Sequence, residues 1–200
     1  MECWTFLWEL VKIIIISVAL IIPIRIFLIQ PFYVQGASMF PNFIQNDYLI
    51  VDEITYGVRD PLSKRRILGG RPPRRGEIVV FSCAMASCGP SQNDFLIKRV
   101  IGLPGETVVL KEGRVAIISK DHPDGFWIRE SYLPPSQGWG VLKDMTVQLS
   151  PREYFVLGDN RANSFDSEDF GAIEDTAIIG RVWLRGWPFN RLTSFTVPSY

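Results

Sequence analysis

Residues 35–41 read Gln-Gly-Ala-Ser-Met-Phe-Pro and separate two unlike parts of the chain. The serine, Ser38, follows two small residues and precedes a Met-x-Pro corner, and Pro41 prevents a helix from continuing through this point. Residues 32–35 have an extended pattern that delivers Ser38 to a turn. Glycine, serine and proline are ordinary turn residues, so this stretch alone predicts a turn and makes Ser38 only a candidate nucleophile.

The part before this turn is almost wholly apolar. From residue 10 to residue 29 the exceptions are Lys12, Ser17, Pro23 and Arg25, and about 20 such residues cross a membrane as a helix. A cleavable signal peptide, with residues 13–24 as its apolar core, is the alternative. It is disfavoured because no small-x-small site follows closely and cleavage would detach Ser38 from its anchor. We expect a tail and transmembrane anchor in residues 1–30 and a second domain in residues 31–200.

The part after the turn has the pattern of β-strands. Runs of β-branched and aromatic residues predict strands at 48–55, 77–81, 95–101, 107–110, 114–119, 153–157 and 177–184. A hairpin turn is expected at Glu112-Gly113, and loops at 56–76 and 120–144. The predicted fold is mainly β, an all-β domain on one N-terminal transmembrane helix.

Charge and cysteine content exclude several classes of partner. The chain has 21 basic and 21 acidic residues, so no net field favours nucleic acid. The loop at 56–76 is rich in arginine, and we leave open whether it is a solvated connector or contacts anionic lipid headgroups. Cys83 and Cys88 share a short loop and could form an optional disulfide. Two cysteines and the single His122 do not make a usual four-ligand metal site, so we expect no metal and no cofactor.

A serine nucleophile needs a base, and the chain offers one unusual candidate. His122 lies in a strong turn signal, which predicts a surface histidine. Lys98 falls inside a predicted strand whose alternation puts it on the same face as Leu96 and Val100. A lysine acts as a base only when neutral, so burial must lower its pKa by roughly two or three units.

Three stretches in this order carry a resemblance. They are residues 35–41, residues 98–106 (Lys-Arg-Val-Ile-Gly-Leu-Pro-Gly-Glu) and residues 158–167 (Gly-Asp-Asn-Arg-Ala-Asn-Ser-Phe-Asp-Ser). Together with residues 31–32, 75–81, 128–133 and 187–191, they resemble the type I signal peptidases, the membrane-bound Ser/Lys proteases that remove signal peptides from exported proteins. The ordered set covers nearly the whole chain and is far more specific than any one motif.

The resemblance implies a mechanism and a set of site residues. Ser38 is the nucleophile that forms an acyl-enzyme, Lys98 is the general base, and Ser164 orients the lysine. The substrate lies extended against the segment before the nucleophile and the strand that bears the lysine. Phe32, Val34, Met39 and Ile97 are implied to line pockets for small residues at the first and third positions before the cut.

The resemblance also implies partners and a location. Partners are preproteins with signal peptides and membrane lipid, but no nucleic acid, and the chain is expected to function as a monomer. The protein is placed in the plasma membrane as a single-pass protein, with its N-terminus inside and its catalytic domain on the extracytoplasmic side.

Three positions depart from the family pattern. Gly36 stands where some members have a serine in the oxyanion hole, Asn42 where threonine is common, and Glu168 where a basic residue usually follows Asp166 by two positions. These departures keep an alternative open: a catalytically impaired, membrane-tethered β domain that binds exported peptides without cleaving them. A self-cleaving repressor with a similar serine motif is disfavoured, because that class lacks a membrane anchor.

Overall fold

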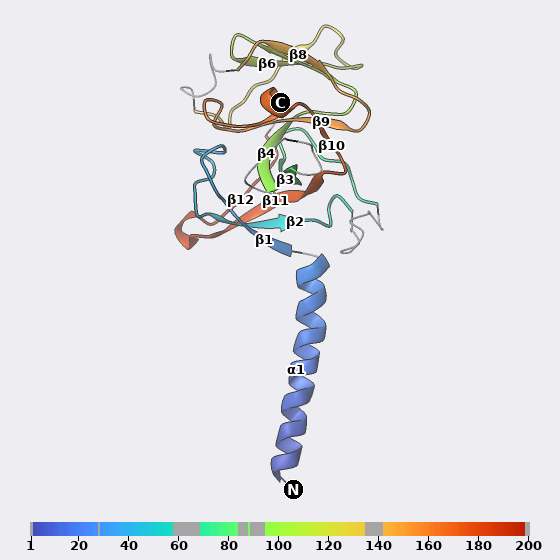
Figure 1. The fold of residues 1–200 in the computed structure, drawn as a ribbon, viewed down its shortest axis with the longest axis vertical. Coiled ribbons are helices and arrows are strands. Elements are labelled where there is room, and N and C mark those ends of the chain that lie inside the picture. Colours follow the sequence, from blue (N-terminus) through green and yellow to red (C-terminus); the bar gives the residue numbers. More distant parts are fainter. Residues whose placement is uncertain are drawn as a thin grey trace.

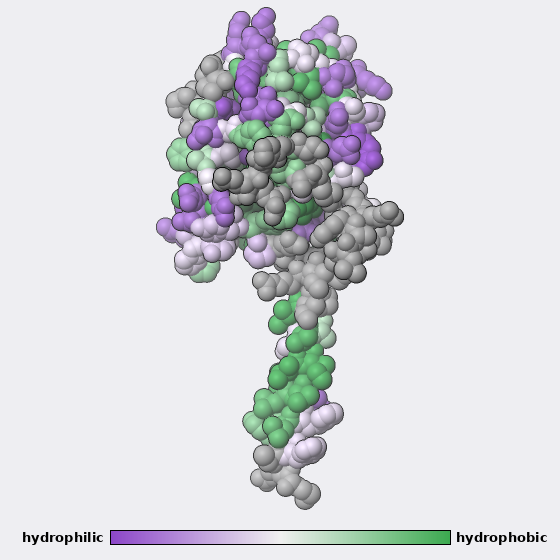
Figure 2. Space-filling model, viewed as in Figure 1, coloured by the Kyte–Doolittle hydropathy of each residue, from purple (hydrophilic) through white to green (hydrophobic). Residues whose placement is uncertain are grey.

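A single long helix begins the chain. The computed structural model describes residues 2–27, 29–57, 69–83, 88, 95–134 and 142–198, and α1 spans Glu2–Phe27. In Figure 1 the helix extends away from the strands, and Figure 2 shows the mostly apolar side chains of residues 4–21 exposed along its length. Within the described residues, Trp4–Ile21 is the one stretch of helix long and apolar enough to cross a membrane. The helix starts earlier than the apolar run predicted from residue 10.

In the described part of the chain, eight antiparallel strands form the first sheet, next to α1 in Figure 1. Their spatial order is β1-β2-β11-β3-β4-β9-β10, with β12 paired to β11. Their bounds are β1 (Ile29–Tyr33), β2 (Tyr48–Asp52), β3 (Ile78–Ser82), β4 (Phe95–Gly102), β9 (Glu153–Leu157), β10 (Ile173–Glu174), β11 (Ile178–Trp187) and β12 (Thr193–Ser194). Because β1 pairs only with β2 in this order, it is a sheet edge.

Four further strands of the described ranges form a second sheet, in the order β7-β6-β5-β8, far from α1 in Figure 1. They are β5 (Thr107–Lys111), β6 (Arg114–Ile118), β7 (Phe126–Trp127) and β8 (Met145–Gln148). At the tip of the β5-β6 hairpin, Glu112 and Gly113 have φ angles of 52° and 72°, as a two-residue hairpin turn requires. The predicted turn is confirmed.

The predicted strands are present, most with small shifts of their ends, and β9 is found at the predicted residues. The strands β7, β8, β10 and β12 were not predicted, and β7 lies in a stretch expected to be a loop. Two short helices complete the described chain, α3 (Ser167–Phe170) and the 3-10 helix η1 (Phe189–Arg191). The mainly β fold with one N-terminal helix is confirmed.

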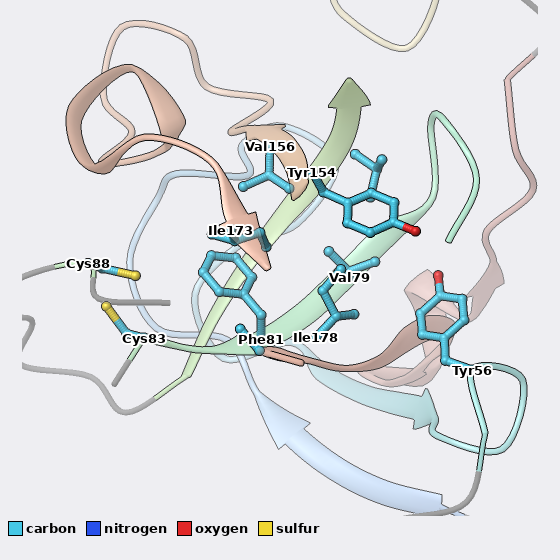
Figure 3. Close-up of a cluster of buried hydrophobic side chains, with 11 residues drawn as sticks. Tyr56, Val79, Phe81, Cys83, Cys88, Tyr154, Val156, Ile173 and Ile178 are labelled. Carbon is cyan, nitrogen blue, oxygen red and sulfur yellow. The ribbon is translucent and has the colours of Figure 1, made fainter. Parts of the chain in front are cut away.

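The core of the first sheet contains both cysteines. Figure 3 shows Cys83 and Cys88 beside each other in a cluster with Phe81 and Ile173, and both thiols are free. Burial, followed by a hydrogen bond with Cys83, raises the pKa of Cys88 to about 12, so this thiol is protonated at neutral pH. The disulfide that the spacing allows is not formed in this structure.

The described part of the basic loop binds the protein itself. Arg71 pairs with Glu77, and Arg75 pairs with Glu106 at 2.6 Å. These two arginines therefore fix the loop's end to β3 and to the turn after β4. The arginines at 65 and 66, through which lipid contact could be tested, lie outside the described residues.

Candidate active site

Ser38 and Lys98 meet although they are 60 residues apart. The chain leaves β1 through Val34, whose N–H donates to the Asp47 carbonyl at 2.9 Å and whose carbonyl accepts from the Asn46 N–H at 3.1 Å, so the approach to Ser38 is fixed. Lys98 lies in the middle of β4. Its Nζ is 3.0 Å from Ser38 Oγ. A hydroxyl and an amine at hydrogen-bond distance form the pair that proton transfer requires.

The environment of Lys98 favours its neutral form. Its side chain is 2% exposed, and burial lowers its pKa from 10.5 to about 8. The negative charges of Asp166 and Asp159 oppose this shift but do not cancel it. With a pKa of about 8, roughly a quarter of the lysine is neutral at pH 7.5, compared with about one in a thousand for an ordinary lysine.

Asn160 holds the turn that carries Ser38. Its backbone N–H donates to the Ser38 carbonyl at 2.9 Å, and its side chain donates to the Ala37 carbonyl at 3.0 Å. Both bonds fix the backbone on either side of the Ala37–Ser38 peptide. The segment from residue 158 therefore does more than shape its own turn, because it also positions the candidate nucleophile.

Gly158 lies between the two serines of the site. A Cβ added there would lie 2.2 Å from Ser164 Oγ and 2.6 Å from the Ser38 carbonyl oxygen, so only glycine allows this approach. Ser164 Oγ is buried and has no hydrogen-bond partner among the described residues. The structure thus brings Ser164 to the site without the predicted bond from its hydroxyl to Lys98.

Backbone groups stabilise Asp166 where the family has a nearby basic residue. The Asp166 carboxylate accepts from the Gly158 N–H at 2.9 Å and, as the N-cap of α3, from the Glu168 N–H at 3.2 Å. Glu168 itself accepts from the Lys143 N–H at 2.6 Å, and burial raises its pKa. The acidic residue at 168 therefore has its own hydrogen-bond partner, although the negative charge of Asp166 also contributes to its raised pKa.

An ion pair that the sequence analysis missed supports the other face of β4. Arg99 donates from Nε and Nη2 to the two carboxylate oxygens of Asp159, at 2.8 and 2.6 Å. Its guanidinium carbon lies 3.8 Å from the centre of the Tyr132 ring. Asn42 donates to Asp159 at 2.8 Å and to the Tyr132 carbonyl at 3.1 Å. The departure at Asn42 is thus part of a bonded network.

A groove of about 280 Å³ opens beside the pair. Three of the four residues expected in substrate pockets line it, namely Phe32, Val34 and Ile97. Met39 is 1% exposed and packs in a core cluster, so the structure does not bring it to the groove. The full lining is Phe32, Tyr33, Val34, Gln35, Ser38, Leu49, Val80, Phe95, Leu96, Ile97 and Lys98.

Two further predictions concern residues near or outside the groove. Gly36 has a φ of +84°, a backbone conformation that glycine adopts readily and a serine would not. His122 is exposed in its turn, as predicted, and is not among the residues that line the groove.

The comparison with protein families agrees with this site. The model described as signal peptidase, peptidase S26, matches residues 7–187. The chain belongs to the S26 signal peptidase family. It is therefore a serine endopeptidase, and the predicted resemblance is confirmed.

Two relatives similar in sequence point the same way. Signal peptidase I of Leptolyngbya laminosa is 41% identical over 199 residues, covering 97% of this chain and 87% of that protein. A probable signal peptidase I-2 of Synechocystis is 36% identical over 190 residues, covering 94% and 77%. A crystal structure of a signal peptidase I from Enterococcus faecalis is 28% identical, covers 56% of this chain and 97% of that one, and has a TM-score of 0.45.

Proposed function

We propose that this S26 peptidase is a membrane-anchored signal peptidase in which Ser38 is the nucleophile and Lys98 the general base. The observation that carries the proposal is the hydrogen bond of 3.0 Å between Lys98 Nζ and Ser38 Oγ. The lysine in this bond has a pKa of about 8. A lysine with an ordinary pKa would be charged and unable to accept the hydroxyl proton.

The reaction proceeds in two steps. Ser38 Oγ attacks the carbonyl carbon of the scissile peptide, Lys98 accepts the hydroxyl proton and passes it to the leaving amine, and an acyl-enzyme remains. Lys98 then activates a water that hydrolyses the ester. The Ser38 backbone N–H, which makes no hydrogen bond among the described residues, is free to stabilise the oxyanion.

The substrate lies as an extended strand between two free edges. Among the described residues, β1 has no partner on its outer side, and β4 pairs with β9 only from Arg99 onward, so no described strand pairs with residues 95–98 on that side. A preprotein strand inserted here would place alternate side chains in the groove. Small residues at the first and third positions before the cut match a groove of this volume.

The anchor places this groove close to the membrane surface. α1 ends at Phe27 and β1 begins at Ile29, and β1 continues into the lining residues Phe32 and Val34. With α1 spanning the bilayer once and its N-terminus in the cytoplasm, the catalytic domain lies on the extracytoplasmic side. A signal peptide that leaves the membrane there would emerge beside β1, which lies next to the end of α1 (Figure 1).

The alternative is a tethered domain that binds exported peptides without cleaving them. Two of the three departures that motivate it have structural compensation, because Asn42 bonds to Asp159 and Asp166 is stabilised by backbone N–H groups. At the third, Gly36 occupies a left-handed conformation that suits glycine. These observations favour the enzyme.

The test is cleavage of a preprotein with a small-x-small signal site by the full-length chain in mild detergent, across pH 6 to 10. We expect cleavage at the signal boundary that rises with pH through an apparent pKa of about 8, and its loss in Ser38→Ala and in Lys98→Ala. Circular dichroism verifies that both variants fold. A folded wild-type chain that leaves a cleavable preprotein uncut would support the binding domain instead.

A further inference from the structure

The peptide unit between Ala37 and Ser38 is held by its carbonyl. The Ala37 carbonyl oxygen accepts two hydrogen bonds, one from the side-chain Nδ2 of Asn160 and one from the backbone N–H of Phe40, both at 3.0 Å. Two such bonds use both lone pairs of a carbonyl oxygen. On the other side of Ser38, its own carbonyl accepts from the Asn160 backbone N–H at 2.9 Å. The plane of the Ala37–Ser38 peptide is therefore fixed.

The opposite end of this peptide unit is the Ser38 N–H. The Ala37–Ser38 bond is trans, and in a trans peptide the N–H points away from the carbonyl, so a bond that holds the Ala37 carbonyl also sets the direction of the Ser38 N–H. Hydrogen bonds in a chain polarise one another, so an amide whose carbonyl accepts two bonds is a stronger N–H donor. Among the described residues this N–H has no acceptor. It is thus oriented, strengthened and available.

Position 36 offers no side-chain donor that could share this work. Gly36 has no hydroxyl, and its φ of +84° lies in the left-handed region that a serine would adopt only under strain. Stabilisation of the oxyanion in this chain therefore depends on the backbone N–H of Ser38 and on the groups that hold it. Within the part of the chain that the structure describes, Asn160 is the one residue whose side chain bonds to the Ala37–Ser38 peptide.

We propose that Asn160 is a positioning residue for the oxyanion: its side-chain amide holds the Ala37 carbonyl so that the Ser38 N–H points at the oxygen of the tetrahedral intermediate. This inference rests on the proposed function, in which that N–H is the oxyanion donor, and deepens it. Asn160 acts through the peptide unit and not by contact with the reacting atoms. Because the oxygen becomes negative only as the intermediate forms, the contribution of Asn160 belongs to kcat and not to KM.

The test compares two substrates that differ in one atom. Both are signal peptides with an ester at the scissile bond, and in one of them sulfur replaces the carbonyl oxygen. Sulfur is a weak hydrogen-bond acceptor, so the thionoester gains little from the oxyanion donor, although both substrates need Ser38 and Lys98. The ratio of kcat/KM for the oxygen ester to kcat/KM for the thionoester therefore reports on the donor. It is measured with the full-length chain in mild detergent, beside cleavage of the preprotein.

Three variants separate the side chain of Asn160 from its backbone. Asn160→Ala removes the bond to the Ala37 carbonyl and keeps the backbone bond to the Ser38 carbonyl. We expect it to lower kcat for the preprotein about ten- to a hundredfold, to change KM less than about threefold, and to lower the ester-to-thionoester ratio at least about fivefold. Asn160→Asp has nearly the same shape but no N–H donor, so kcat and the ratio should also fall. Asn163→Ala is the matched control, because Asn163 is an exposed asparagine of the same segment whose side chain makes no hydrogen bond among the described residues.

The possible results distinguish the oxyanion donor from the nucleophile. A kcat in Asn160→Ala within about twofold of the wild type overturns the inference and leaves the proposed function standing. A lower kcat with an unchanged ester-to-thionoester ratio also overturns it, because Asn160 would then hold the Ser38 hydroxyl and not the donor. An equal fall of the ratio in Asn163→Ala overturns it as well, since the effect would not belong to the bond with Ala37.

Two further results concern the wild type and the folding of the variant. A folded wild type that leaves the preprotein uncut overturns both this inference and the proposed function. If circular dichroism shows that Asn160→Ala does not fold, Asn160→Asp decides: a lower ester-to-thionoester ratio supports the inference, and an unchanged ratio refutes it.

Discussion

Lys98 and Arg99 are neighbours on β4, point to opposite faces and are 2% and 4% exposed. Arg99 has a bidentate bond to Asp159, a bond to the Gly76 carbonyl at 2.9 Å and an aromatic ring beside it. Within the part of the chain that the structure describes, Lys98 has only neutral bonding partners, the Ser38 hydroxyl and the Ile97 carbonyl, both at 3.0 Å. A buried cation that must stay charged is thus paired, whereas one that must lose its proton is left without a bonded carboxylate.

The largest effect on stability should come from removing the carboxylate that pairs with Arg99. Asp159→Ala leaves the Arg99 guanidinium buried without its carboxylate, which should lower the free energy of unfolding by about 3 to 5 kcal/mol. Urea unfolding of the full-length chain in detergent, followed by tryptophan fluorescence, measures it. The control is Asp175→Ala, which removes the pair with the exposed Arg152 and should leave the urea midpoint almost unchanged. Equal midpoints for the two variants would contradict the prediction.

Replacing Lys98, the cation without a bonded carboxylate, should raise the free energy of unfolding. The folded-state pKa of Lys98, about 8, is below its unfolded value of 10.5, so a destabilising contribution is fully present below pH 8 and fades between pH 8 and 10.5. Lys98→Met should therefore raise the free energy of unfolding by about 3 kcal/mol at pH 7, with the gain shrinking toward pH 10.5. The same urea measurement at pH 7 and pH 10 tests it. A gain independent of pH would show that packing, and not charge burial, is responsible.

A smaller loss of stability is expected when Asn42, which bonds to the partners of Arg99, is replaced. Asn42→Ala removes one donor to Asp159 and one to the Tyr132 carbonyl, and should lower the free energy of unfolding by about 1 to 2 kcal/mol. In an Asp159→Ala background the loss should be smaller, because one of the two acceptors is already gone. Additive effects in this double-mutant cycle would mean that Asn42 acts separately from the ion pair.

The position of Lys98 was easier to predict from the sequence than the ion pair of Arg99. Alternation along a strand is a local property, so the position of Lys98 on an apolar face and the bounds of β9 follow from the pattern. The bond between Arg99 and Asp159 joins the middle of β4 to the segment after β9, 60 residues away, and no spacing rule selects one carboxylate among many. Only the adjacency of Arg99 to Lys98, on the opposite face, hinted at a second buried cation.

The remaining misses have related physical causes. The strands β7, β10 and β12 are two residues long, which is too short for an alternation to be recognised. An apolar side chain beside the nucleophile suits a pocket and a core equally well: Val34 and Met39 pack in the same core cluster, and only Val34 also lines the groove. Hydrophobicity alone carries no information on that choice.

The smallest effect on stability should come from Ser164, because its buried Oγ makes no hydrogen bond that Ser164→Ala would remove. We expect the free energy of unfolding to change by less than about 1 kcal/mol.

The same substitution, Ser164→Ala, should have a larger effect on activity. Once Lys98 has taken the proton it has three N–H donors, while the structure gives its Nζ two acceptors, and we expect the unbonded Ser164 Oγ to act as a third. A bond to the charged form raises a pKa, so losing it should move the pH–rate limb to lower pH and reduce kcat ten- to a hundredfold. Ser164→Cys keeps a weak acceptor, so its kcat and its pH–rate limb should lie between those of the wild type and Ser164→Ala. An unchanged pH profile in Ser164→Ala would remove Ser164 from the mechanism and leave Lys98 positioned by Ser38 and β4 alone.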